Sequence, residues 1–74
     1  MTLVELKKNE EAIVKKINAP KDLKQRLISF GVMKNAKIKL LATAPKKSTI
    51  EIEVGKMKLA LRKEEAQMIE VEKC

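Results

Sequence analysis

A short helix that stops at a glycine and gives way to a strand constrains the fold more than any other feature of the chain. The apolar residues Leu23, Leu27 and Phe30 recur at i, i+4 and i+7, which places them on one stripe of a helix. Pro20 fits the first turn of this helix, and Gly31 can take the left-handed conformation that closes it. The sequence therefore predicts a helix between Pro20 and Gly31 whose apolar stripe, Phe30 included, lies on a core.

Three strands are expected after the helix. Residues 36–40, 50–54 and 57–61 alternate apolar with polar or small residues, which is typical of a strand with one buried face. The Pro-containing loop at 44–48 separates the first pair, and Gly55 marks a turn or bulge between the second pair. Because both connections are short, the three strands should form an antiparallel meander.

Further elements are expected on either side of this meander. Residues 11–17 predict an earlier strand, although the adjacent pair Ile13 and Val14 breaks its alternation. Residues 2–6 fit either an edge strand or one helical turn, and residues 62–67 predict a single turn before a closing strand at 68–71. With about five strands, one helix and short connections, the 74 residues should form a single domain that is mainly β, a small closed or nearly closed barrel.

Missing residue types exclude most catalytic and metal chemistry. The chain has no His, Trp or Tyr and only two glycines, so the commonest general base, the commonest transition-metal ligand and a Gly-rich phosphate loop are all absent. We therefore expect no enzyme, no cofactor and no metal site. The one cysteine, Cys74, has no partner, which fits a reducing compartment. With no basic-apolar leader and no long apolar run, the sequence favours a cytoplasmic protein with no membrane span.

Two carboxylate pairs remain, Glu51 with Glu53 and Glu64 with Glu65. Residues i and i+2 of a strand share a face, so Glu51 and Glu53 could chelate a hard cation or act as an acid and base. Ordinary cross-strand pairing with outward lysines is the favoured interpretation. The lysines available for that pairing are Lys37, Lys39 and Lys58.

Charge is the unusual feature of the composition. The chain carries 17 Lys and Arg against 10 Asp and Glu, a net charge of +7, and residues 26–62 hold nine basic and two acidic residues. Such a surface attracts nucleic acid, anionic lipid or an acidic protein, or is merely solvated. Nucleic acid is disfavoured because Phe30 is the only aromatic residue on which a base could stack. The basic face is expected to consist of Lys37, Lys39, Lys56, Lys58 and Arg62.

A second candidate surface lies on the flank of the helix. Ile28, Val32 and Met33 are apolar but fall off the stripe of Leu23, Leu27 and Phe30. They would serve either to close one end of the barrel or as an exposed contact patch. We expect this helix flank to anchor a partner and the basic face to steer it, because buried apolar anchors carry most interface energy.

The order of these residues resembles the FeoA family of ferrous iron transport accessory proteins, and the same module forms the C-terminal domain of iron-dependent repressors of the DtxR type. The resemblance covers nearly the whole chain. The residues that carry it are Leu3, Leu6, Val14, Ile17, Leu27, Gly31, Val32, Ala36, Ile38, Leu40, Ala44, Pro45, Ile50, Ile52, Val54, Met57, Leu59, Ala60, Leu61, Arg62, Ala66, Ile69 and Val71.

The turns depart from the family pattern at two places. Members usually carry Pro-Gly where this chain has Lys8-Asn9 and Lys34-Asn35. Asn is the non-glycine residue that best tolerates the left-handed conformation, so Asn9 and Asn35 should keep these turns.

The resemblance implies a small SH3-like barrel in the cytoplasm that assists FeoB, the ferrous iron permease, and it supplies no catalytic or metal-ligating motif. A basic regulatory or nucleic-acid-binding module and a metal-sensing domain are the alternatives. The sequence leaves the oligomeric state open.

Overall fold

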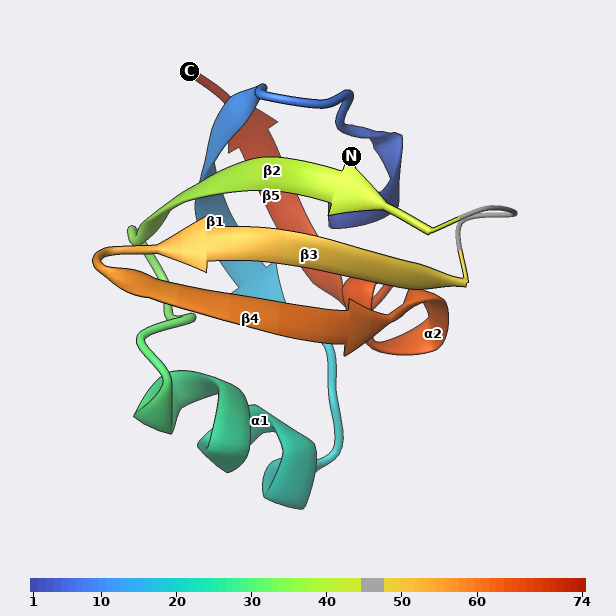
Figure 1. The fold of residues 1–74 in the computed structure, drawn as a ribbon. Helices are drawn as coiled ribbons and strands as arrows, with labels where there is room; N and C mark the ends of the chain where they lie inside the picture. The colour runs from blue at the N-terminus through green and yellow to red at the C-terminus, as the bar shows by residue number, and fades with distance from the viewer. Residues whose placement is uncertain (45–47) are drawn as a thin grey trace.

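The computed structural model describes residues 1–44 and 48–74 (Figure 1). The expected helix, the meander, the earlier strand and the closing strand are all confirmed, and residues 2–6 contain a single 3-10 turn. Most of the expected loop at 44–48 lies outside the described residues. In chain order the elements are η1 (Leu3–Glu5), β1 (Glu11–Ile17), α1 (Lys21–Ser29), β2 (Lys37–Thr43), β3 (Thr49–Val54), β4 (Met57–Arg62), α2 (Lys63–Ala66) and β5 (Ile69–Lys73).

The five strands form one antiparallel sheet in the order β4-β3-β2-β1-β5 (Figure 1). Within the described residues no ladder joins β4 to β5, so the expected barrel is open at this seam. The single turn α2 connects the two outer strands across the seam, and η1 packs beside α2. Thr2 forms a bridge with Glu70, so the N-terminal segment covers the outer edge of β5 and β4 keeps a free edge.

Two β-bulges interrupt the alternation of side chains along the strands. The register of β1 against β5 shifts between Val14 and Lys16, and Val14 and Ile17 therefore both point into the core with two residues between them. The register of β2 against β3 shifts between Leu40 and Ala42. A bulge adds one unpaired residue to a strand and increases its twist, which helps a five-stranded sheet to curl around its own apolar face.

The core is built from apolar side chains alone, and none of the described polar or charged residues is buried. Strands β1, β2, β3 and β5 contribute alternate or near-alternate residues, as one-sided strands require, and η1, α1, β4 and α2 contribute one residue each. Its members are Leu3, Leu6, Ala12, Val14, Ile17, Leu27, Val32, Ile38, Leu40, Ile50, Ile52, Val54, Leu61, Ala66, Ile69 and Val71.

Helix α1 ends in a Schellman motif. Gly31 has a φ of +97° and donates its N–H to the Ile28 carbonyl at 2.9 Å, and the Val32 N–H bonds to the Leu27 carbonyl at 2.9 Å. Both bonds satisfy carbonyls that the last helical turn would leave open, and an apolar contact normally accompanies them. The prediction for Gly31 is confirmed. Val32 is fully buried beside Leu27, so its placement on an exposed flank was wrong.

The remaining turn predictions are also confirmed. Asn9 and Asn35 have φ values of +71° and +74°, and Gly55 has a φ of +61°. Gly55 and Lys56 form a two-residue hairpin loop between the paired residues Val54 and Met57. A positive φ at the first loop position is the geometry that matches the twist of the flanking strands.

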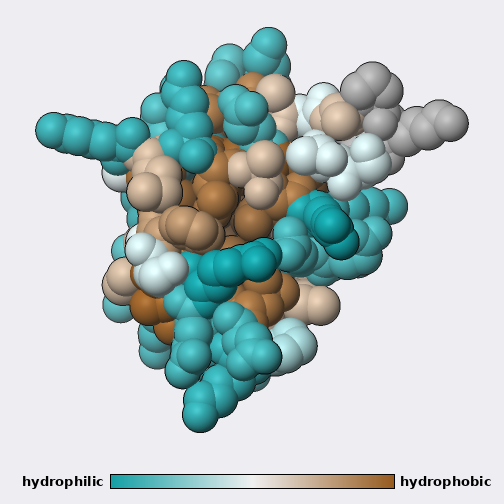
Figure 2. Space-filling model, turned by 60° about the horizontal axis from the view of Figure 1, so that its bottom comes forward, coloured by the Kyte–Doolittle hydropathy of each residue, from teal (hydrophilic) through white to brown (hydrophobic). Residues whose placement is uncertain are grey.

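Helix α1 stands off from the sheet rather than lying flat on it (Figure 1). Leu27 is its only buried residue, Leu23 packs partly against the core, and Phe30 at its end is only half-buried. The prediction that Phe30 belongs to the core was wrong, because the Schellman turn sends Val32 there instead. Figure 2 shows the result: apolar surface gathers where α1 meets the sheet, with hydrophilic side chains around it.

Candidate protein-binding surface

A groove of about 620 Å³ runs between α1 and β1. The side chains of Ile17, Ile28 and Met33 form its apolar lining, and the latter two are 39% and 42% exposed. Because Ile28 and Met33 line the same groove, they form an exposed apolar patch, which is more informative than scattered exposed residues. We call this surface the lysine groove; it is lined by Lys15, Lys16, Ile17, Lys24, Ile28, Met33 and Lys34.

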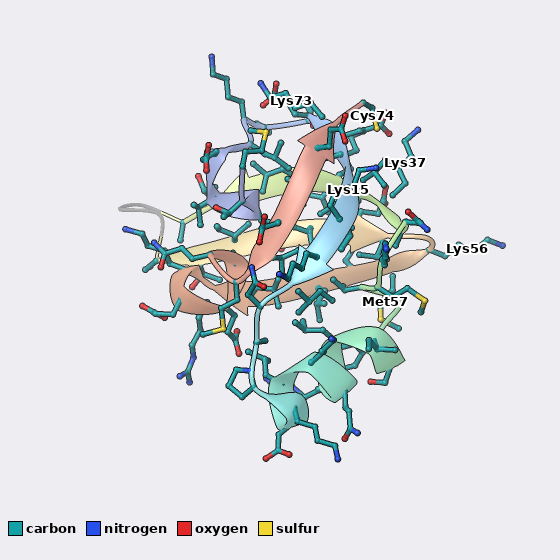
Figure 3. The ribbon with its side chains drawn as sticks, turned by 180° about the vertical axis from the view of Figure 1, so that it is seen from behind. Lys15, Lys37, Lys56, Met57, Lys73 and Cys74 are labelled. Carbon is teal, nitrogen blue, oxygen red and sulfur yellow. The ribbon has the colours of Figure 1, made fainter. Side chains whose placement is uncertain are left out.

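Positive charge surrounds the lysine groove. Four of its lining residues are lysines, and no carboxylate lines it among residues 1–44 and 48–74. Lys15 lies on β1, as the rear view of Figure 3 shows. Its Nζ is 3.5 Å from Oε2 of Glu72 on the neighbouring strand β5. For Lys16, Lys24 and Lys34 the described part of the chain supplies no ion pair. The groove therefore combines an apolar centre with a positive rim, and long lysine stems extend its apolar walls.

The expected basic face is interleaved with carboxylates. Lys37 pairs with Glu11 at 3.4 Å, and Glu53 lies in register between Lys39 of β2 and Lys58 of β4. The register thus places Glu53 opposite two lysines, as expected, and the positive charge of this face is diluted. For Glu51 the expected pairing was wrong, because Glu51 lies opposite Ala42 and Ala60.

Two other residues of the expected basic face sit at the ends of β4. Figure 3 shows Lys56 projecting from the β3–β4 hairpin, and Arg62 lies at the opposite end of β4. Met57, expected to face inward with the alternating residues of its strand, is 45% exposed because the strand begins there, at the hairpin.

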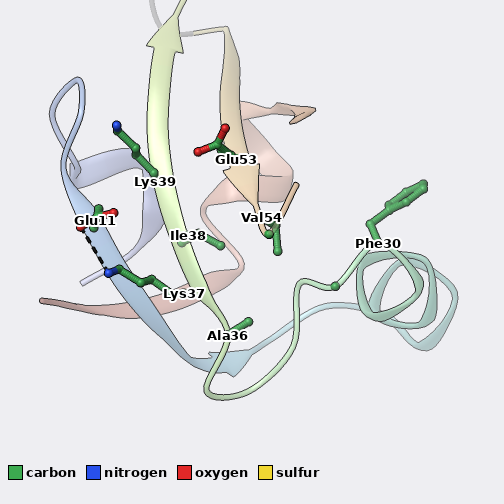
Figure 4. A pocket seen from close by; sticks show the side chains of 10 residues that line it. Glu11, Phe30, Ala36, Lys37, Ile38, Lys39, Glu53 and Val54 are labelled. Carbon is green, nitrogen blue, oxygen red and sulfur yellow. Dashed lines mark ion pairs between the residues drawn. The ribbon is translucent and has the colours of Figure 1, made fainter. Parts of the chain in front are cut away.

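A second hollow of about 530 Å³ lies beside the end of α1 (Figure 4). Phe30 and Val54 provide its apolar part, and the ion pair of Lys37 with Glu11 crosses one side. Its charges are balanced by Glu53, so it has neither the single sign of charge nor the exposed aliphatic residues of the lysine groove.

Sequence reasoning found Ile28 and Met33 but missed the residues that face them. The spacing of Lys24 and Ile28, four apart on α1, was the available signal that both lie on one helix face. Sequence reasoning did not identify the strand that this helix face lies beside, which is β1 with Lys15, Lys16 and Ile17.

The second carboxylate pair has structural contacts instead of a shared site. Glu65 accepts a hydrogen bond from the Arg62 backbone N–H at 2.9 Å and pairs with Arg26 of α1 at 3.3 Å, while Glu64 is exposed. Glu65 therefore caps α2 and ties it to α1. Within the described ranges no three potential ligands from His, Cys, Asp and Glu cluster together.

No helix in residues 1–44 or 48–74 has the length and apolar character needed to cross a membrane.

Known proteins resemble this chain in sequence and in fold. The FeoA domain model matches residues 1–73. The chain belongs to the FeoA family. It is 45% identical over 71 residues to the Campylobacter jejuni protein named Fe(2+) transport protein A, covering 96% of each chain. The recognition of the family from the order of apolar and turn residues is confirmed.

Solved FeoA structures share the fold. The FeoA protein of Chlorobium tepidum is 37% identical with a TM-score of 0.91, over 96% of this chain and 68% of that one. The FeoA of Stenotrophomonas maltophilia, solved with zinc and described as an SH3 domain protein, is 29% identical with a TM-score of 0.85, over 97% and 89% of the two chains. The fold is therefore SH3-like and mainly β with one full helix, as expected.

A manganese-dependent transcriptional repressor also contains this fold. The TM-score is 0.88 at 18% identity, and the match covers all of this chain but 36% of the repressor. This confirms that the FeoA fold also occurs as a module of metal-dependent repressors.

Proposed function

We propose that this FeoA protein is a non-enzymatic cytoplasmic accessory protein of ferrous iron transport that binds the cytosolic face of the FeoB permease. The family and the names of its relatives place the chain in Fe(2+) transport. The observation that carries the binding role is the pair of exposed apolar residues Ile28 and Met33 inside a positively charged rim. Apolar residues left outside a small core are typical of a contact surface.

The two candidate surfaces have different roles in this proposal. Ile28 and Met33 anchor the partner, since apolar residues that become buried in an interface contribute most of its binding energy. Lys37 and Lys39 lie on the sheet beyond the groove and accelerate the encounter with an acidic partner, an effect that salt weakens. Val32 has no part in either role because it is buried.

A binding assay against the cytosolic domain of FeoB tests the proposal. Met33→Asp should weaken binding by about tenfold or more, because a carboxylate would have to be desolvated in the interface. Lys37→Glu with Lys39→Glu should slow association at low salt and matter less at moderate salt. Met57→Asp is the matched control, since Met57 is similarly exposed but does not line the lysine groove.

Two results would contradict these roles. If the lysine double variant abolishes binding at both salt levels while Met33→Asp binds normally, the anchor and the steering surface have been exchanged. If the wild-type protein shows no binding to the FeoB domain at all, the adaptor function itself is wrong.

A further inference from the structure

We propose that the lysine groove binds an acidic amphipathic segment of a protein partner, with apolar side chains on Ile28 and Met33 and carboxylates on the lysine rim. The inference rests on the proposed function, because it describes the chemistry of the segment that the transporter would present. It commits the groove to one class of occupant that neither the fold nor the family specifies.

Shape is the first argument for a peptide. A concave groove of about 620 Å³ falls within the range of about 300–1,000 Å³ that is usual for binding pockets. Lys24 and Ile28 of α1 line one side of it, and an apolar stripe at i, i+3 or i+4 on a partner helix fits a hydrophobic groove of this kind. Because α1 is held to the sheet through Leu27 alone among its buried residues, the walls of the groove can adjust to a partner.

Charge complementarity is the second argument. Lys16, Lys24 and Lys34 surround the apolar lining without ion-pair partners in the described residues. Their ammonium groups can each accept a carboxylate of the bound segment, which fixes its orientation and disfavours basic segments. The chain as a whole carries +7, so an acidic segment is also attracted from a distance.

Other occupants fit less well. A second copy of this chain would bring its own net charge of +7 to a groove that is already rimmed by lysines. A flat anionic bilayer cannot fill a concave groove. A nucleic acid strand would find no aromatic residue there, since Phe30 lines the other hollow.

The inference is tested by nuclear magnetic resonance titration of the ¹⁵N-labelled protein with synthetic peptides. The probe is a helix-forming peptide that carries Leu at i, i+4 and i+7 and Glu at the flanking positions. One control peptide replaces each Glu with Lys, and a second replaces each Leu with Ser. The first peptide alone should shift the amides of Ile17, Ile28 and Met33, because it supplies both the apolar stripe and the carboxylates.

Matched variants locate the binding site. Met33→Asp should lower the affinity for the acidic peptide by about tenfold, and so should the double variant Lys24→Glu with Lys34→Glu. Met57→Asp at the β3–β4 hairpin, and Lys7→Glu with Lys8→Glu in the turn between η1 and β1, make the same charge changes outside the groove and should leave the affinity within about twofold. Unchanged amide spectra away from the substituted residues verify that each variant is folded.

Three outcomes would overturn the inference. The basic peptide could bind as tightly as the acidic one, the groove variants and the control variants could lose the same affinity, or the groove amides could fail to shift. Shifts of the same amides by vesicles of anionic lipid but not by the peptide would point to a membrane. A dimer in sedimentation that Met33→Asp dissociates would point to a second copy.

The peptide assay contains no transporter, so the two proposals fail separately. Loss of peptide binding with retained FeoB binding would contradict only the inference. Peptide binding without FeoB binding would contradict only the proposed function.

Discussion

Four of the residues that the structure describes hold a positive φ, and each lies in a turn: Asn9, Gly31, Asn35 and Gly55. Three of them have φ values between +61° and +74°, which asparagine reaches at little cost. Gly31 differs because its φ is +97° and a Cβ there would lie 3.3 Å from a methyl group of Val54. Gly31 is therefore the turn residue that the fold can least replace.

Replacing Gly31 with Val should destabilise the protein by about 1 kcal/mol or more, since a β-branched residue is least tolerant of positive φ. Urea unfolding followed by circular dichroism measures the change. Gly55→Asn is the control: a Cβ at Gly55 meets no atom within 4 Å, and its φ of +61° suits asparagine. Equal losses in the two variants would contradict the special role of Gly31.

A second residue-scale prediction concerns acid. The pKa of Glu10 is lowered mainly because its carboxylate accepts a hydrogen bond from the Lys7 backbone N–H. Lys73, whose Nζ lies 3.0 Å from Glu10 Oε2, lowers this pKa further. A carboxyl whose pKa is lower in the folded state adds stability above its unfolded pKa and loses it as pH falls through the folded pKa. Glu10→Gln should therefore unfold more easily than wild type at pH 7, and the difference should shrink by pH 3.

Thermal unfolding of both proteins at the two pH values measures this change. Glu64→Gln is the control, because Glu64 is an exposed carboxylate in α2 for which no side-chain hydrogen bond or ion pair is present in the described residues. A difference for Glu10→Gln that stays constant with pH would show that its charge is irrelevant.

At the scale of elements, α1 is the least firmly attached part of the fold. Leu27 and the neighbouring Val32 hold it to the core, and Arg26 adds one partly exposed ion pair to Glu65. A partly exposed pair of this kind contributes little stability. The helix therefore depends on one buried leucine more than any strand depends on one of its residues.

Leu27→Ala should cost about 2–4 kcal/mol, while Ile28→Ala should change stability by less than about 0.5 kcal/mol, because only Leu27 is enclosed. Urea unfolding gives the two free energies. Hydrogen exchange of the α1 amides should accelerate in Leu27→Ala before the β2 and β3 amides do. Uniform acceleration across helix and sheet would mean that α1 unfolds only with the whole protein.

The elements could be predicted from sequence because helix and strand periods are local properties. The sequence also indicated Ile28 and Met33, but it misplaced Val32 and Phe30, since a Schellman turn decides which of two apolar residues returns to the core. The rim of the lysine groove could not be predicted. Lys16 of β1 and Lys24 of α1 line the same groove only because of the way α1 is oriented against the sheet, which no local sequence pattern reveals.

At the scale of the whole molecule, the carboxylates are spread over different elements and no transition-metal site is expected. Anaerobic titration with ferrous, manganous or zinc ions should leave the amide spectrum largely unchanged, because His is absent and the one thiol stands alone. Cys74→Ser separates any weak thiol effect from binding elsewhere. A stoichiometric site of submicromolar affinity would support the metal-sensing alternative.

The first residues of the chain lie along the outer edge of β5, its last strand. The Val71 N–H bonds to the Met1 carbonyl at 2.8 Å, and Thr2 bridges to Glu70. Figure 1 shows both ends on the side of the molecule away from α1. A fused protein joined at either end would therefore sit opposite the helix and leave the lysine groove uncovered. Because both ends lie on one side of the molecule, the domain can be joined to a longer chain without covering the groove. This arrangement suits the occurrence of the fold within the longer repressor chain.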